Sequence, residues 1–195
     1  GYLACGWIGK GRLAEPDAIV DAADRLLRPN PSLLGVRVLV TAGPTYEDLD
    51  PVRYIGNRSS GRMGFALAEA AAARGALVRL VVGPTDVTPP SGMIEIAHVR
   101  SAADMHGAVM NWRDWADVVI MAAAVADYTP ARGAEGEKIA KGGPMDLPLT
   151  RTRDILMELG TSRGDSRRPV LVGFAAETRD TAVKVVFKVS DKGRR

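Results

Sequence analysis

Two glycine-containing segments of this sequence carry residue types that can bind an anionic group. The first is residues 43–45 (Gly-Pro-Thr), and the second is residues 57–61 (Asn-Arg-Ser-Ser-Gly), with Gly64 three residues later. Glycine lets backbone N–H groups approach an anion closely, and Ser59 or Ser60 can cap a helix whose N-terminus favours phosphate. The spacing is typical of a phosphate cradle, and equally of a capped helix that packs closely on a strand through Gly64.

Three further segments place charged or aromatic side chains after apolar runs. Asp127 ends residues 122–127 and can accept hydrogen bonds from a ribose or a base, although an isolated aspartate often serves only a turn or a helix cap. Lys138 and Lys141 lie in a glycine-rich stretch, where they can neutralise a triphosphate or belong to a surface loop. Phe174 follows the last apolar run and either lines a base pocket or fills the core.

Other cofactor chemistry is disfavoured by the sequence. There is no Gly-x-Gly-x-x-Gly, no Walker motif and no Tyr-x-x-x-Lys pair, and the run ending at Val82 is followed by Gly-Pro rather than by an acid for a ribose hydroxyl. A single cysteine, Cys5, excludes an internal disulfide. With only His98 and His106 besides, no cluster has zinc-ligand spacing.

The elements that must position these residues follow from the pattern of apolar residues. Helical patterns alternate with β-branched runs, which is typical of a parallel sheet covered on both faces. The expected strands are residues 36–41, 77–82, 94–99, 118–121 and 170–172, and the expected helices between them are 61–74, 102–112 and 154–159. Ligands of such sheets bind beyond the carboxyl ends of the strands. We therefore expect function in the loops at residues 42–60, 83–92 and 122–150.

Composition sets the class of protein. The 195 residues are 46% apolar and 25% charged, which fits an ordinary packed domain. The net charge of +3 is too small to indicate nucleic-acid binding, and no apolar stretch is long enough to cross a membrane, so the cytoplasm is the expected location. Residues 184–195 are the most basic stretch and can be a solvated tail or an anion site.

Seven blocks of the sequence together resemble phosphopantothenate–cysteine ligase, the synthetase half of the bifunctional bacterial coenzyme A biosynthesis protein. They are residues 43–45, 50–55, 57–61, 63–64, 123–128, 137–139 and 173–178, in the family's order. The first twelve residues resemble the end of the other half, phosphopantothenoylcysteine decarboxylase, whose catalytic proton donor matches Cys5.

The resemblance implies an α/β, Rossmann-like three-layer domain with a mostly parallel sheet. Residues 1–28 would be the end of a flavin-dependent decarboxylase domain, 29–34 a proline-rich linker, and 35–195 an incomplete ligase domain, truncated at its C-terminus. The implied reaction joins 4′-phosphopantothenate to cysteine through an acyl-cytidylate made from CTP, with Mg2+ bridging the phosphates. FMN would serve only the decarboxylase of a longer parent protein.

The resemblance also assigns roles to residues. Asn57 matches the asparagine needed to turn over the acyl-cytidylate, and Lys138 matches the lysine of a loop that closes on the triphosphate. The positions matching CTP contacts are Gly43, Ser60, Gly61, Ala123, Asp127, Lys138, Arg153, Asp154, Ile155, Phe174, Lys188 and Lys192. This assignment favours an anion-binding role for the basic tail, and it names no metal ligand.

Three departures from the family pattern bear on activity. The lysine loop, residues 138–141, has Ala140 where the family has a lysine but keeps its two outer lysines. Thr152 and Arg153 replace a frequent Asn-Pro, which we expect to be tolerated. The third departure is the serious one, because the family continues beyond Arg195 with a further strand, and a sheet without that strand exposes an edge. From this third departure we expect weak or absent ligation by this chain, with nucleotide binding partly retained. The alternatives are a non-catalytic nucleotide-binding fragment and, less favoured, an NADPH-dependent reductase. The resemblance implies a homodimer formed through the ligase domain, and a larger assembly in the parent.

Overall fold

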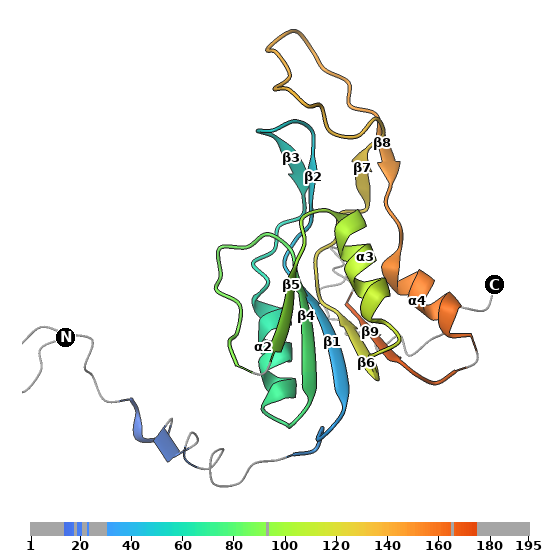
Figure 1. The fold of residues 1–195 in the computed structure, drawn as a ribbon. Helices are drawn as coiled ribbons and strands as arrows, with labels where there is room; N and C mark the ends of the chain where they lie inside the picture. Colours follow the sequence, from blue (N-terminus) through green and yellow to red (C-terminus); the bar gives the residue numbers. More distant parts are fainter. Residues whose placement is uncertain are drawn as a thin grey trace, which may run out of the picture.

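The computed structural model describes residues 14–17, 19–20, 23, 31–92, 94–164 and 166–174, and the findings below concern these residues. At its centre lies a five-stranded sheet in the order β5-β4-β1-β6-β9, with every neighbouring pair parallel (Figure 1). The strands are β1 (Arg37–Ala42), β4 (Leu77–Val82), β5 (Ile94–His98), β6 (Val118–Met121) and β9 (Val170–Gly173). The five strands and the parallel sheet predicted from the sequence are confirmed.

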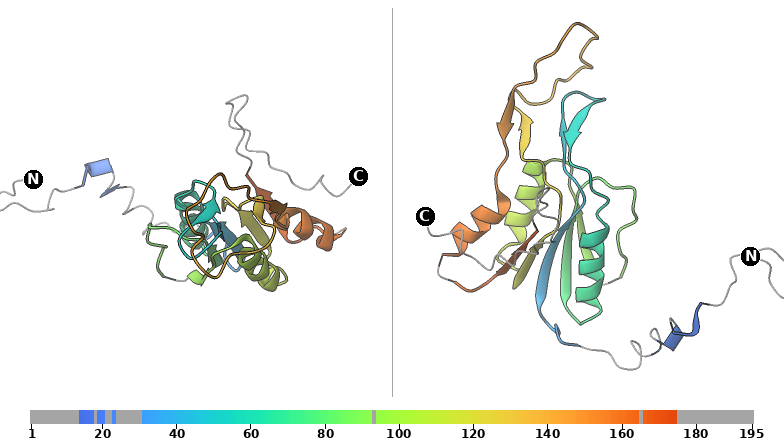
Figure 2. Two further views of the ribbon diagram at one scale, coloured as in Figure 1. Left: turned by 90° about the horizontal axis from the view of Figure 1, so that it is seen from above. Right: turned by 180° about the vertical axis from the view of Figure 1, so that it is seen from behind.

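Side chains alternate between the two faces of the central strands, as the pleat requires. Val38 and Val40 of β1 pack under α2 (Arg62–Ala72), whereas Leu39 belongs to a second apolar cluster under α3 (Ala102–Trp112) and α4 (Ile155–Arg163). One helix therefore covers one face and two cover the other (Figure 2). This is the predicted three-layer architecture. None of the described helices is both long and apolar enough to span a bilayer.

The N-termini of α3 and α2 are capped in different ways. Ser101 and Asp104 form a reciprocal capping box at α3, and the buried carboxylate of Glu47 accepts the N–H of Ala102 at 2.8 Å. For α2, the prediction of a serine cap is wrong. Its N-cap is Gly61, with φ of 75° and no side-chain cap, while the Ser59 hydroxyl accepts only the N–H of Gly61 itself.

Two short hairpins extend beyond the carboxyl edge of the sheet, in segments where the sequence pattern predicts loops (Figure 1). The first pairs β2 (Tyr46–Asp48) with β3 (Tyr54–Gly56), and the second pairs β7 (Tyr128–Pro130) with β8 (Leu149–Arg151). The rings of Tyr46 and Tyr54 stack with centroids 3.8 Å apart, and Arg100 makes two 2.7 Å hydrogen bonds to Asp48. The stack holds the two strands of the first hairpin together, and the bonds from Arg100 tie the hairpin to the body of the protein.

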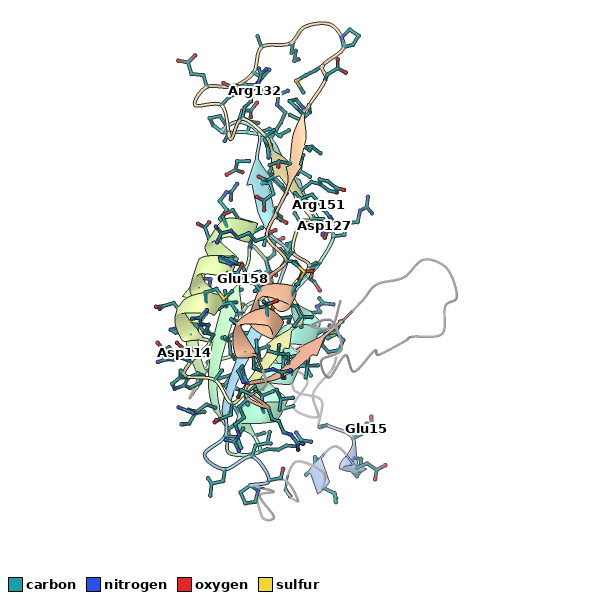
Figure 3. The ribbon with its side chains drawn as sticks, turned by 90° about the vertical axis from the view of Figure 1, so that its right-hand side faces the viewer. Glu15, Asp114, Asp127, Arg132, Arg151 and Glu158 are labelled. Atoms are coloured by element: carbon teal, nitrogen blue, oxygen red, sulfur yellow. The ribbon has the colours of Figure 1, made fainter. Side chains whose placement is uncertain are left out.

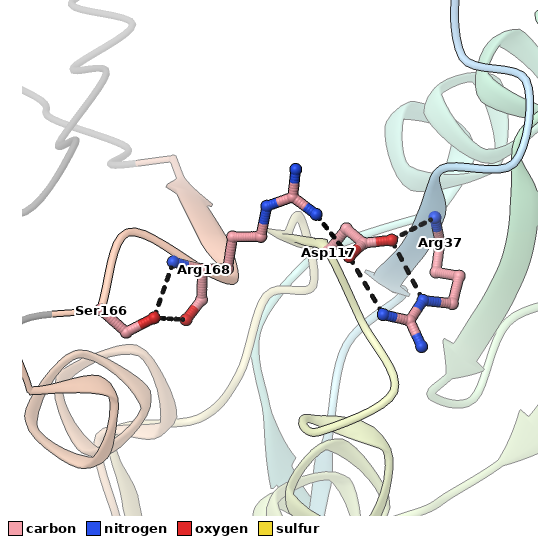
Figure 4. A network of polar contacts seen from close by, with 4 residues as sticks. All are labelled: Arg37, Asp117, Ser166 and Arg168. Atoms are coloured by element: carbon pink, nitrogen blue, oxygen red, sulfur yellow. Dashed lines mark hydrogen bonds and ion pairs between the residues drawn. The ribbon is translucent and has the colours of Figure 1, made fainter.

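The opposite edge of the sheet is fastened by an ionic network (Figure 4). Asp117 accepts hydrogen bonds from the backbone N and Nε of Arg37, both at 3.0 Å, and from Arg168 at 3.2 Å. The side-chain hydrogen bond from Arg37 is the largest cause that holds the pKa of Asp117 well below its ordinary value, and the backbone hydrogen bond from Arg37 is the next largest. Ser166 exchanges hydrogen bonds with the backbone of Arg168. The network joins the starts of β1, β6 and β9.

Candidate active site at the carboxyl edge of the sheet

The loops that follow β1 and β6 are bonded to one another. The Ala124 N–H donates to the Gly43 carbonyl at 2.8 Å, and the Thr45 N–H donates to the Ala124 carbonyl at 3.4 Å. The fully buried Thr45 hydroxyl accepts the N–H of Ala126 at 2.9 Å. Because the chain proceeds from β1 to β4 and β5 on one side and returns to β6 and β9 on the other, this junction is the switch point where doubly wound sheets bind ligands.

Glycines bring the start of α2 directly against this junction. A Cβ on Gly64 would lie 2.5 Å from the Cβ of Ala42, and a Cβ on Gly61 would lie 3.2 Å from the backbone N of Gly43. Gly64 therefore packs closely on β1, as one of the two interpretations of this segment predicts. The first N–H groups of a helix lack intrahelical partners, and no side chain caps α2. The helix therefore presents free N–H groups and its positive dipole end beside Gly43, as an anion site requires.

Asn57 lies against the β6 loop. Its exposed side chain donates from Nδ2 to the Val125 carbonyl at 2.9 Å, two residues before Asp127. Asp127 has an exposed side chain at the base of the β7–β8 hairpin, where Arg151 also lies (Figure 3). Its backbone is fixed by the N–H of Thr152, which donates to the Asp127 carbonyl at 3.0 Å. The structure therefore brings the segments of Asn57 and Asp127 together.

Lys138 stands farther out, in the exposed loop between β7 and β8. The same loop lines a cavity of about 640 Å³ together with Leu49, but neither Asn57, Asp127 nor Lys138 is among the lining residues. Lys138 nevertheless belongs to a loop that leaves and returns at the same hairpin base as Asp127.

The remaining predicted site residues differ in their surroundings. The Ala123 N–H donates to the Thr41 hydroxyl at 3.1 Å, and the Ser60 carbonyl accepts from Thr85 at 2.8 Å. Arg153 is exposed and Phe174 is 38% exposed, so both side chains are accessible.

Two of the predicted residues begin α4 and serve the fold there. Asp154 is its N-cap, because the Asp154 carboxylate accepts the N–H of Met157 at 2.9 Å. Ile155 is only 3% exposed and packs in the core, so a nucleotide could contact its backbone but not its side chain. Cys5, Lys188 and Lys192 lie outside the described residues.

Polar side chains that the sequence pattern does not single out support the same edge. Thr45 and Thr152 brace the β6 loop, the latter by donating its hydroxyl to the Ala126 carbonyl at 2.7 Å. Asp50 and Arg53 reach the lysine loop by contacts with Ile139. Asp50 and Arg53 both lie in a block that carries the family resemblance, which was the available signal. Among the described residues, no three His, Cys, Asp or Glu side chains are grouped as a metal site.

Comparison with known proteins bears on what this edge does. Residues 33–194 match the family model described as the DNA/pantothenate metabolism flavoprotein C-terminal domain. The chain belongs to this family. A coenzyme A biosynthesis bifunctional protein CoaBC from Bacillus subtilis (strain 168) is 50% identical over 182 residues, which are 92% of this chain and 44% of that protein. The resemblance seen in the sequence blocks is confirmed.

Two further similarities extend the family comparison. The crystal structure of the C-terminal domain of a CoaBC protein is 45% identical, with a TM-score of 0.64 over 77% of this chain and 69% of that one. A cysteine/cysteine sulfinic acid decarboxylase from an unknown prokaryotic organism is 46% identical over 198 residues, covering 98% of this chain and 54% of that protein. This member of the flavoprotein C-terminal domain family thus spans about half the length of the curated relatives it matches.

Proposed function

We propose that this chain carries the phosphopantothenate–cysteine ligase activity of a coenzyme A biosynthesis protein. A carboxylate oxygen of 4′-phosphopantothenate attacks the α-phosphorus of CTP, forming the acyl-cytidylate and releasing pyrophosphate. The amine of cysteine then attacks the acyl carbon, the new amide bond forms, and CMP leaves. The product is phosphopantothenoylcysteine, which a complete parent protein with an FMN-dependent decarboxylase domain would convert to phosphopantetheine.

The observation that carries the proposal is the arrangement of backbone around Gly43 and Gly61. The uncapped N-terminus of α2 faces the loop after β1, and that loop is bonded to the loop after β6. Free N–H groups and a helix dipole at one point stabilise phosphate without a side chain. CTP and the acyl-cytidylate both place phosphate groups there, which agrees with the glycines found at these positions.

Asn57 is suited to the acyl centre. An asparagine amide has two N–H hydrogens, and the bond to the Val125 carbonyl uses one of them. The other remains available for the acyl oxygen, on which negative charge develops when cysteine attacks. A donor already held in place costs no reorganisation as that charge forms, which is the basis of oxyanion stabilisation. Lys138 would neutralise the triphosphate from the loop above.

Mg2+ fits the proposal as a companion of the phosphates. The described residues hold no group of three acidic or imidazole side chains, so phosphate oxygens and water would supply most of its ligands. The ion would neutralise charge on the leaving pyrophosphate. No residue of this chain is assigned to it, and FMN is assigned to the decarboxylase part of longer relatives.

Self-association is part of the same proposal. Exposed apolar side chains gather on the two hairpins and the loops at their tips: Val52, Tyr54, Tyr128, Met145 and Leu149. Such a group on a protruding surface is typical of a protein interface. We propose a homodimer formed through the hairpins, and we propose that it works in the cytoplasm. Sedimentation velocity should show a dimer for the wild type. Charged substitutions of Val52 and Leu149 should convert that dimer to a monomer.

The ligase proposal is tested by pyrophosphate release from CTP and 4′-phosphopantothenate in the absence of cysteine. We expect release by the wild type, and loss of release in Lys138→Gln but not in the charge-matched control Arg113→Gln, because Arg113 lies at the far end of α3. Asn57→Ala should still release pyrophosphate but accumulate acyl-cytidylate when cysteine is added, whereas Asn111→Ala on the exposed side of α3 should turn over normally.

The alternative of a non-catalytic nucleotide-binding domain predicts a different result in this assay. CTP would bind, but no pyrophosphate would be released under any condition. Binding of NADPH in competition with CTP would favour the reductase alternative instead.

A further inference from the structure

Asp50 is a buried carboxylate with an unusual number of partners. It lies in the turn between β2 and β3 and is 2% exposed. Its Oδ1 accepts the backbone N–H groups of Val52 and Arg53, both at 2.8 Å, and its Oδ2 accepts Nε of Arg53 at 2.8 Å. One carboxylate oxygen thus shapes the turn, while the other holds the arginine that faces it.

The same pair reaches across to the loop that contains Lys138. Oδ2 of Asp50 also accepts the N–H of Ile139 at 3.2 Å, and Arg53 donates to the Ile139 carbonyl at 2.7 Å. Both backbone polar groups of Ile139 are therefore held by side chains that lie more than 80 positions earlier in the sequence. Ile139 directly follows Lys138.

The rest of the loop has few attachments around this point. Residues 131–138 and 140–146 are exposed, whereas Ile139 is half-buried. A second tether lies three residues before Lys138, where the Glu135 N–H donates to the Leu49 carbonyl at 2.8 Å. Lys138 is thus placed between two tethers, and both lead to the turn at residues 49–53.

The charge of Asp50 makes the attachment persistent. Burial by itself raises the pKa of this carboxyl, but the hydrogen bonds from the backbone of Val52, the side chain and backbone of Arg53, and the backbone of Ile139 outweigh it, so its pKa lies well below the ordinary value. The group stays ionised at neutral pH, and hydrogen bonds to an ionised acceptor are roughly twice as strong as neutral ones.

We infer that Asp50 and Arg53 are positioning residues that hold the lysine loop in place for the triphosphate. They act through the backbone of Ile139 and fix where Lys138 stands. This inference rests on the proposed role of Lys138 in ligation. The geometry of the latch, defined as Asp50, Arg53 and Ile139, is a property of the chain itself and can be tested separately.

Asp50→Asn separates the latch from the turn. The amide oxygen can still accept from Val52 and Arg53, but the amide nitrogen replaces Oδ2 and meets the N–H donors of Ile139 and Arg53. Two donors facing each other cannot bond, so the loop loses its bond to residue 50 and Arg53 loses the carboxylate that holds it, while the backbone bonds of the turn remain. Asp146→Asn, an exposed carboxylate in the same loop, is the matched control. Arg53→Lys is a second variant, which keeps the charge but not the two-pronged contact.

Limited trypsin cleavage after Lys138 measures the latch without reference to catalysis. Loss of charge-assisted bonds should raise the cleavage rate about tenfold or more in Asp50→Asn and Arg53→Lys, and leave Asp146→Asn at the wild-type rate. Unchanged cleavage in both latch variants, in protein with the wild-type unfolding midpoint, would overturn the inference whether or not the chain is a ligase.

Pyrophosphate release then tests the link to Lys138. Asp50→Asn should raise KM for CTP about tenfold in this assay. Because Lys138→Gln is expected to release no pyrophosphate, the double variant is measured by calorimetric CTP binding: Asp50→Asn should weaken binding in the wild-type background and add nothing in the Lys138→Gln background, since a positioning residue acts only through the group it positions. An equal loss in both backgrounds would mean a general structural role and would overturn the inference. If the wild type releases no pyrophosphate, the proposed function fails, and the cleavage result alone decides the latch.

Discussion

Gly64→Ala perturbs the contact that seats α2 on the central strand. The added Cβ would lie 2.5 Å from the Ala42 Cβ and 2.9 Å from the Thr41 carbonyl oxygen. Both atoms belong to β1, which is buried from Val38 to Ala42 and has a paired strand on either side, so they cannot move aside without a large cost. Overpacking of this kind costs about 1–3 kcal/mol. Alanine regains at most about 1 kcal/mol of helix propensity over glycine. We expect a net loss of about 1–2 kcal/mol in the free energy of unfolding.

Gly107→Ala is the matched control for this change. It makes the same substitution in the middle of α3, where an added Cβ meets no atom within 4 Å. The helix-propensity gain should then appear alone, as a stabilisation of about 0.5–1 kcal/mol. Urea unfolding followed by circular dichroism measures both variants against the wild type.

Gly64→Ala also tests the proposed nucleotide site. Because the α2 N-terminus must move away from Gly43 to admit the methyl group, CTP should bind more weakly to folded Gly64→Ala and with wild-type affinity to Gly107→Ala. A Gly64→Ala protein that is stabilised as much as Gly107→Ala would refute the close contact. Reduced stability with unchanged CTP affinity would refute the placement of the nucleotide beside Gly43.

Two further predictions concern buried polar groups. Thr45→Val leaves the N–H of Ala126 without its acceptor and should cost about 1–3 kcal/mol in urea unfolding, whereas Thr161→Val, at an exposed hydroxyl on α4, should change little. The pKa values of Asp50 and Asp117 are lowered from 3.8, so the stability these carboxylates contribute is complete above that pH and is lost as acid protonates them below it. Unfolding midpoints between pH 5 and pH 2.5 should therefore fall less steeply in Asp117→Asn than in the wild type, and equal slopes would contradict the Arg37–Asp117–Arg168 network.

The central sheet was predictable because its strands are long enough to show a pattern. Residues 77–82 and 118–121 were predicted with the bounds that the structure has, since buried strands of a parallel sheet are rich in apolar residues. The run 118–121 is wholly apolar, and 77–82 is interrupted only by Arg79. The hairpins were missed because strands of three residues, such as β2 and β8, carry no periodicity. Their register depends on tertiary contacts such as the Tyr46–Tyr54 stack.

The candidate site was predictable where it depends on local sequence, and not where it depends on contacts between distant segments. Gly43 and Gly61 both adopt positive φ at the ends of the elements they join, as their type suggested. The serine cap of α2 was wrong, because Gly61 itself occupies the N-cap position. The attachment of Ile139 to Asp50 joins residues 89 positions apart, which no spacing rule within one sequence can predict.

The position of bound CTP tests the account most directly. Backbone amide shifts of the isotope-labelled chain, recorded by NMR during titration with CTP and Mg2+, should change first at Gly43, Gly61 and residues 62–64. Further changes should follow at residues 123–127, where the β6 loop meets the β1 loop. Saturable shifts confined to other parts of the chain, or none at millimolar CTP, would contradict a nucleotide site at the junction of β1 and β6.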